Sequence, residues 1–358
     1  MYARSTQLTG LRSSCAESLE VSEMDHFVLH NTRQVAAETA AAPRRAHLAK
    51  LVLYRILGAL FVLWAATTLT FLAVHATPGD TVSLLLGENR DDPVLRARTI
   101  ERWGLDHPLW YQYLVYLARI PTGDLGTSYS FSRPVTSLLA ESIGPTLQLA
   151  FSAAIGAVLI AYLLTVLTST RFRRLRPISQ VVELILLSAP AFWLGIVLLL
   201  VFSFKLGWFS IVDPDSPSAL VLPALSLALP IGCYLTQILR DGADRAMEQP
   251  FSLTSRSRGL SAPQVHTRHA LKHGTVPVIT VLGLVIGSLI GGAVVVEQVF
   301  GRSGLGQIAV QAVTVKDIPL ILGITLVATA AFVAASTAVD IVALAIDPRL
   351  RTARASRS

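Results

Sequence analysis

The stretch TLQLAFSAAIGAVLIAYLLTVLT (residues 146–168) runs for 23 positions without a single Asp, Glu, Lys or Arg. A helix of about 20 apolar residues spans the roughly 30 Å hydrocarbon core of a bilayer. The stretch therefore predicts a transmembrane helix. Five further apolar segments predict five more, at 51–76, 178–204, 219–239, 277–296 and 318–346. We expect an all-α membrane protein with six transmembrane helices.

The composition agrees with a polytopic membrane protein. Of the 358 residues, 52% are hydrophobic and only 15% are charged, whereas soluble domains average about 25% charged residues. This balance excludes a soluble globular protein, a disordered chain and a fibrous protein. The two cysteines, Cys15 and Cys233, form neither a disulfide framework nor a CxxC metal motif, so we expect free thiols.

The distribution of lysine and arginine predicts the orientation in the membrane. With the N-terminus in the cytoplasm, the inner segments hold 21 of these residues and the outer segments hold nine. The strongest contributions come from the short loop TRFRRLRP (170–177) and the tail RLRTARASR (349–357). Because positive charge stays inside, both termini are expected in the cytoplasm. The same rule explains the net charge of +7 better than nucleic-acid binding does.

Four parts are expected along the chain. Residues 1–45 are polar, lack helical periodicity and lack the apolar core of a signal peptide, which predicts a disordered cytoplasmic tail. A true start further along, for example at Met24, is the alternative. The other expected parts are a first transmembrane helix with an extracytoplasmic subdomain (46–140), a core with the remaining helices (141–346) and a basic cytoplasmic tail (347–358).

The outer segment that follows the first span carries its own structural signals. Trp110, Tyr113, Leu114 and Leu117 recur at helical spacing and predict one aromatic-rich helix face. That face suits either the membrane interface or packing on the protein itself. The following GDLGTSY (123–129) has the glycines and the aspartate of a turn.

No enzymatic site is predicted. A phosphate-binding loop needs GxxxxGK[ST], and none of the four lysines is followed by Ser or Thr. His269 and His273 have a metal-compatible spacing but no third ligand nearby, so solvated histidines are expected. The glycine-rich GRSGLG (301–306) does not follow a strand and predicts no nucleotide site.

The spans carry few ionisable residues. Glu183 and Asp340 each lie about a turn and a half from the cytoplasmic end of a span, and we expect both to reach the interface. No charge falls at the centre of a span, whereas ion-coupled carriers usually place ionisable groups there. An ion-coupled secondary carrier is therefore the alternative function rather than the favoured one.

Glycine and proline mark expected packing and bending. Gly283, Gly287 and Gly291 repeat every four residues, so one helix face can pack closely against another helix. Pro190 and Pro230 fall inside predicted spans and should bend them.

The cytoplasmic loop 240–276 predicts two short helices. Gly259 should close the first helix and Pro263 should open the second. A basic helical hairpin below the membrane is either a docking element for a partner or a lipid-surface contact, and the residues leave both open.

Seven motifs, in order from about Leu51 to Arg351, resemble the permease subunits of the dipeptide, oligopeptide and nickel ABC importers. They are ATPGD (76–80), GLDHPLWYQYLVYL (104–117), GDLGTSYSFSRPV (123–135), SAPAFWLGIVLLLVFSFKLGWF (188–209), RGLSAPQVHTRHALKHGTVPVIT (258–280), EQVFGRSGLG (297–306) and DPRLR (347–351). The segment LTSRSRGL (253–260) departs from the pattern, because Ser255 and Ser257 stand where the family has Ala. Ser303 also replaces the usual Pro of the outer loop.

The resemblance implies a type I ABC importer permease that transports peptides or a related solute such as a nickel chelate. It implies a second homologous permease, two ATPase subunits and an extracytoplasmic binding protein as partners in a bacterial cell membrane. ATP and magnesium would be bound by the ATPases, with no cofactor on this chain. Loop 240–276 would then be the coupling loop.

The resemblance also assigns roles to residues of this sequence. ATPase docking is expected from Arg256, Arg258, Gly259, Leu260, Arg268, His269 and Leu271. Extracytoplasmic loop positions are expected at Gly123, Asp124, Gly126, Glu297, Gly304 and Gly306.

Overall fold

The computed structural model describes residues 52–169, 173–209 and 217–346. The tails expected at 1–45 and 347–358 lie outside these residues. The chain divides into two compact units, Met1–Val62 and Leu63–Ser358. All contacts described below lie within the second unit.

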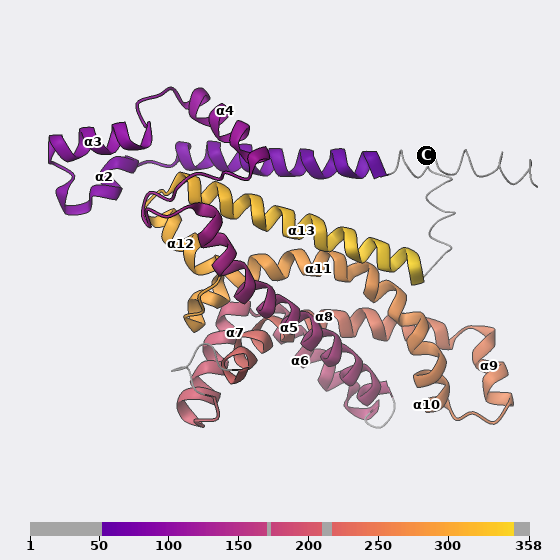
Figure 1. Ribbon diagram of the computed structural model, residues 1–358. Coiled ribbons are helices and arrows are strands. Elements are labelled where there is room, and N and C mark those ends of the chain that lie inside the picture. Colours follow the sequence, from indigo (N-terminus) through magenta and orange to yellow (C-terminus); the bar gives the residue numbers. More distant parts are fainter. Residues whose placement is uncertain (1–51, 170–172, 210–216, 347–358) are drawn as a thin grey trace, which may run out of the picture. The chain divides into compact units, whose positions relative to one another are not determined.

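The described residues are almost entirely helical, with one isolated bridge between Thr127 and Pro134. The first helix is Val52–Ala76. The helices that follow it (Figure 1) are α2 (Thr81–Leu86), η1 (Gly87–Asn89), α3 (Pro93–Trp103), α4 (Leu109–Arg119), η2 (Ile120–Thr122), α5 (Val135–Ser169), η3 (Arg173–Leu175), α6 (Arg176–Ser188), α7 (Ala191–Leu198), η4 (Leu199–Lys205), η5 (Pro217–Leu220), α8 (Val221–Met247), α9 (Pro250–Ser257), α10 (Ala262–Val265), η6 (His266–Ala270), α11 (Leu271–Phe300), α12 (Leu305–Thr314) and α13 (Ile318–Ile346).

Four of the helices are long and apolar enough to cross a membrane, over the residues that the structure describes. They are Val52–Ala76, Val135–Ser169, Ser218–Met247 and Ile318–Val339. A fifth candidate is the bent pair formed by α6 with α7 and η4. The fifth expected span, 277–296, lies within α11, a continuous helix of 30 residues.

The third expected span, 178–204, is not one straight helix. It breaks at Ala189 and Pro190, and its two halves meet at an angle of 106°. Proline has no backbone N–H and clashes with the preceding turn of a helix, so the bend expected at Pro190 is confirmed. Pro230, by contrast, lies inside the continuous helix α8.

Small residues bring the central helices together. Ala153, Ala157 and Ala161 of α5 are fully buried against α8. Gly232 of α8 allows the same close approach, because a Cβ atom there would lie 2.8 Å from Ile160. Helices in membranes associate through such close packing, and α8 also contacts α6, α7 and α11.

Helix α5 starts earlier than the apolar run predicts. It begins at Val135 and contains Pro145 in its interior, so the domain boundary expected at 140/141 falls inside a helix. The residues that precede the apolar run are drawn into the helix by tertiary burial, since Val135, Leu138 and Leu139 pack against α12 and α13.

Candidate functional site

The segment between α8 and α11 folds as a helical hairpin made of α9, α10 and η6 (Figure 1). Helix α9 ends in a Schellman motif, in which Gly259 N–H donates to Arg256 O and Leu260 N–H donates to Ser255 O. Gly259 has a φ of +89°, a conformation that strains any residue with a Cβ. Ser261 and Gln264 then form a capping box at the start of α10, next to Pro263. The ends expected at Gly259 and Pro263 are confirmed.

One face of this hairpin is free within the described chain. Arg256, Arg258 and Gly259 are exposed, and no atom lies within 4 Å of a Cβ built on Gly259. Arg268 and His269 are exposed as well. We call this set of residues, together with Leu260 and the 74% exposed Leu253, the docking face.

The opposite face, which we call the anchor, attaches the hairpin to the helix bundle through α10 and η6. Val265, His266 and Ala270 are buried, and η6 contacts α8. Leu271 is also buried, as part of the main apolar core. Its expected role in docking is therefore wrong, because a side chain that fills the core offers no surface to a partner.

Two glycines seat the anchor. A Cβ on Gly242 of α8 would lie 2.7 Å from Gly274 Cα, and a Cβ on Gly274 of α11 would lie 2.6 Å from Leu239 O. The two backbones therefore touch where α8 and α11 meet the hairpin. The sequence does not predict this crossing, because the two glycines belong to no repeat and lie in different helices.

The charged residues of α6 and α8 pair inside the protein. The carboxylate of Glu183 contacts the Arg240 guanidinium at 2.6 and 3.1 Å, and both side chains are almost completely buried. The expectation that Glu183 reaches the membrane interface is therefore wrong. Arg240 was expected at the start of the coupling loop, but it lies within α8, because this helix continues to Met247. The side chain of Asp340 lies outside the description.

Two more contacts complete this network. Thr168 Oγ1 of α5 accepts from Arg240, and Ser179 Oγ donates to Glu183. One turn further along α8, Asp244 accepts from Arg176 of α6 at 2.6 Å. Two ion pairs thus join α6 to α8 next to the hairpin. In one the carboxylate belongs to α6, and in the other it belongs to α8.

His266 lies in the anchor, close to the second ion pair. Burial lowers the pKa of His266, while the Asp244 carboxylate raises it and Arg176 lowers it further. Neither ring nitrogen has a hydrogen-bond partner within the described chain. Burial therefore favours the neutral imidazole over the protonated one.

The pKa of His266 predicts a pH dependence of stability. Because the pKa in the folded state lies below its ordinary value of 6.5, the unfolded chain binds more protons near that pH. The contribution of neutral His266 to the free energy of unfolding is fully present above about pH 6.5. It is lost as the pH falls through the pKa of His266 in the folded state. We expect the melting temperature of His266→Leu to change less than that of the wild type between about pH 7.5 and pH 5. Equal changes in both proteins would contradict the prediction.

Glu297 belongs to a buried joint rather than to an exposed loop. It lies in α11 and is fully buried, and it accepts from Thr146 Oγ1 at 2.6 Å and from Gly306 N at 2.7 Å. A Cβ on Gly304 would overlap the Glu297 carboxylate. The expected loop position of Glu297 is therefore wrong, because the glycines of the GLG motif let α12 fold back over this carboxylate.

A second buried joint lies just before α13. Asp317 accepts from the side chains of Ser128 and Ser130 and from the backbone N–H of Ser130. Lys316, at a φ of +54°, donates to the carbonyl oxygens of Thr77 and Gly79. The two residues before α13 therefore bind both the ATPGD segment and the GDLGTSYS segment through hydrogen bonds. No sequence motif predicts a role for Lys316 or Asp317.

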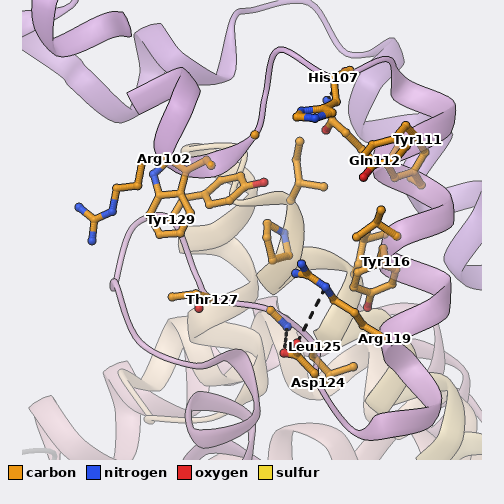
Figure 2. A pocket seen from close by; sticks show the side chains of 18 of the residues that line it. Arg102, His107, Tyr111, Gln112, Tyr116, Arg119, Asp124, Leu125, Thr127 and Tyr129 are labelled. Carbon is orange, nitrogen blue, oxygen red and sulfur yellow. Dashed lines mark hydrogen bonds and ion pairs between the residues drawn. The ribbon is translucent and has the colours of Figure 1, made fainter. Parts of the chain in front are cut away.

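Two of the remaining expected loop residues, Asp124 and Gly126, border a cavity (Figure 2). Asp124 Oδ1 accepts from Gly126 N at 2.9 Å, and the Arg119 side chain lies beside the same carboxylate. Gly123 and Gly126 both have positive φ, so the turn expected at 123–129 is present.

The three repeating glycines of α11 differ in their surroundings. A Cβ on Gly287 would overlap the ring of Phe332 in α13, whereas no atom lies within 4 Å of a Cβ on Gly291. Close packing is therefore present at Gly287 and absent at Gly291 among the residues that the structure describes. The surroundings of Gly283 lie outside the description.

Gly287→Ala should destabilise the fold by about 1–3 kcal/mol, because the added methyl group collides with Phe332. The measurement is the melting temperature of the purified protein. Gly291→Ala is the matched control, and we expect it to leave that temperature unchanged. Adding Phe332→Ala should recover part of the loss, and equal effects of the two glycine substitutions would contradict this packing.

The sequence matches one known family of membrane transport proteins over most of its length. Residues 157–352 match the family described as "Binding-protein-dependent transport system inner membrane component", and residues 48–150 match its N-terminal region. The chain belongs to this permease family. The resemblance read from the seven motifs is confirmed, as is the expected place in a bacterial inner membrane.

Similar proteins cover nearly the whole permease. The glutathione transport system permease protein GsiC of Escherichia coli K12 is 33% identical over 301 residues, which is 84% of this chain and 98% of that protein. GsiC of Salmonella typhi is 34% identical over the same lengths. A solved amino acid ABC transporter, crystallised with histidines, is 18% identical with a TM-score of 0.46, over 57% of this chain and 92% of that one.

Family membership settles the coarse function. The permease is the membrane-embedded subunit of an ABC importer and a transport component rather than an enzyme. Such a permease works with ATPase and substrate-binding protein partners. Within this frame, the docking face is the candidate contact for an ATPase.

Proposed function

We propose that this permease pairs with a second homologous permease and imports short peptides or glutathione-like molecules. Two separate ATPase subunits, which bind ATP and magnesium, supply the energy, and an extracytoplasmic binding protein delivers the substrate. The names of the GsiC relatives support the substrate class. Nickel chelates are the second substrate class to test.

The observation that carries the coupling proposal is the two-faced hairpin. Its docking face is exposed and basic, while its anchor is buried against α8 and joined to α11 through Gly274. A force applied to the exposed face therefore reaches two long helices of the bundle. A hairpin that only lay on the lipid surface would have no need for this buried attachment.

The proposed topology has six spans, with α11 as the fifth, and places the docking face and both termini in the cytoplasm. It rests on the lysine and arginine asymmetry. A reporter fused at Ser358 that is active only outside the cytoplasm would refute this orientation.

The experiment for substrate class is uptake into proteoliposomes that contain the complete importer and its binding protein. We expect ATP-dependent uptake of radiolabelled glutathione or dipeptides, and none by an importer that lacks this permease. Uptake of a nickel chelate alone would replace the proposed substrate class. Uptake driven by an ion gradient without ATP would restore the alternative of a secondary carrier.

A further inference from the structure

A cavity of about 560 Å³ lies between α3 and α4, on one side, and the segment 124–129 with the start of α13, on the other (Figure 2). Its volume is within the range of small-molecule pockets. Aromatic rings form much of its wall, and Trp103 packs on Tyr129 with 4.9 Å between ring centroids. Residues near the ends of two candidate spans also line it, among them Phe71 of the first helix and Ile318 of α13.

Two opposite charges stand side by side in this cavity. Arg119 Nε lies 4.0 Å from Asp124 Oδ2, and both side chains are more than half exposed. An exposed pair at this distance contributes little to stability, so a ligand can separate it at low cost. The other nearby guanidinium, that of Arg102, lies over the Trp103 ring and points away from Arg119 (Figure 2).

A buried hydroxyl lies on the same wall. Tyr116 precedes Arg119 by one helical turn in α4, and both border the cavity. The Tyr116 hydroxyl oxygen is buried and has no hydrogen-bond partner within the described chain. Buried polar groups in native proteins nearly always have a partner, so this hydroxyl is an unused hydrogen-bonding group beside the cavity.

We infer that this cavity binds the head group of an α-amino acid, with the ligand carboxylate on Arg119 and the ligand ammonium on Asp124. Both charges of such a head group are carried by one carbon, which matches two oppositely charged side chains in direct proximity. An ordinary dipeptide separates its terminal charges by about 3.5 Å per residue. The inference rests on the proposed function in peptide-type uptake, and it narrows the substrate class to molecules with a free amino-acid end.

Two isomers of glutamyl-alanine, which have the same atoms and the same net charge, test the inference. γ-Glutamyl-alanine carries its ammonium and one carboxylate on the same carbon, whereas α-glutamyl-alanine does not. Binding of each radiolabelled isomer is measured on the complete importer in nanodiscs, without the binding protein. We expect the γ isomer to bind at least about tenfold more tightly, equivalent to one charge-assisted contact.

Variants of the pair connect this preference to the cavity. Arg119→Gln and Asp124→Asn should each weaken binding of the γ isomer about tenfold, and Asn keeps an acceptor for the Gly126 N–H. Tyr116→Phe should weaken it less, and Arg102→Gln is the control that leaves it unchanged. Each variant is first shown to have a wild-type melting temperature, and Arg119→Lys provides a second, milder variant.

Several outcomes overturn the inference. They are equal binding of the two isomers, no binding of either, and γ-isomer binding that survives Arg119→Gln and Asp124→Asn. Variants that lose affinity for the binding protein but still bind the γ isomer would show a protein-docking surface instead. If the wild-type importer transports peptides without favouring the γ isomer, the head-group inference fails while the proposed function stands. If it transports no peptide at all, the proposed function fails.

Discussion

Glu183→Ala is expected to destabilise the permease by about 3–5 kcal/mol, the usual effect of removing one partner of a buried ion pair. The Arg240 guanidinium is almost completely buried, so the variant leaves a cation in the protein interior without its carboxylate. Thr168 is the other side chain that accepts from Arg240, and a neutral hydroxyl does not compensate a full charge. The measurement is the melting temperature of the purified permease together with its abundance in the membrane.

Removing both charges separates pairing from packing. The double substitution Glu183→Leu with Arg240→Met should recover most of the loss, because apolar residues of similar size often replace a buried ion pair without cost. The exposed pair between Arg133 and Glu141 is the matched control, and we expect no measurable change for Glu141→Gln. If Glu183→Ala were as stable as the wild type, the buried ion pair would be wrong.

Gly259→Asp is expected to abolish uptake and transport-stimulated ATP hydrolysis together, while the permease still inserts in the membrane. Aspartate at a φ of +89° strains the turn, and its charge then lies between Arg256 and Leu260 on the docking face. No span is altered and no neighbouring atom is displaced, since the space around Gly259 is open. Uptake and ATPase activity are measured in proteoliposomes that contain the complete importer.

The matched control places the same strain elsewhere. Gly87 also has positive φ and open surroundings, but it lies between α2 and η1, far along the chain from the hairpin. Gly87→Asp should therefore leave coupling intact. A cysteine at Leu260 should cross-link to the ATPase in the assembled importer. If that cysteine reacts freely with a water-soluble reagent in the full complex, and Gly259→Asp transports normally, the hairpin is a lipid-surface element.

Local chemistry explains why the hairpin could be predicted. The Schellman turn at Gly259 and the capping box at Ser261 each involve residues within five positions of one another. The helix predicted around Trp110 and Leu114 is present as α4 for the same reason. Trp110 and Leu114 are largely exposed, whereas Tyr113 packs on Phe71. One helix face is therefore partly at the surface and partly in contact with the protein.

The buried polar contacts that could not be predicted join residues far apart in the sequence. Glu183 and Arg240 are separated by 57 positions, and Asp317 and Ser128 by 189. Nothing near Glu183 in sequence distinguishes a carboxylate that reaches the interface from one that meets a guanidinium. The rotation of α6 against α8 makes that choice, and it depends on packing along the whole of both helices.

The sequence by itself determined the class of protein, the apolar runs, the charge asymmetry and the turns, because hydropathy and turn geometry act over a few residues. Tertiary structure alone decided which charges are buried and which glycines touch a neighbouring helix. It also decided that Leu271 fills the core and that Arg119 and Asp124 share a cavity. These outcomes depend on close packing between segments distant in sequence, where a shift of one helix face exchanges buried for exposed positions.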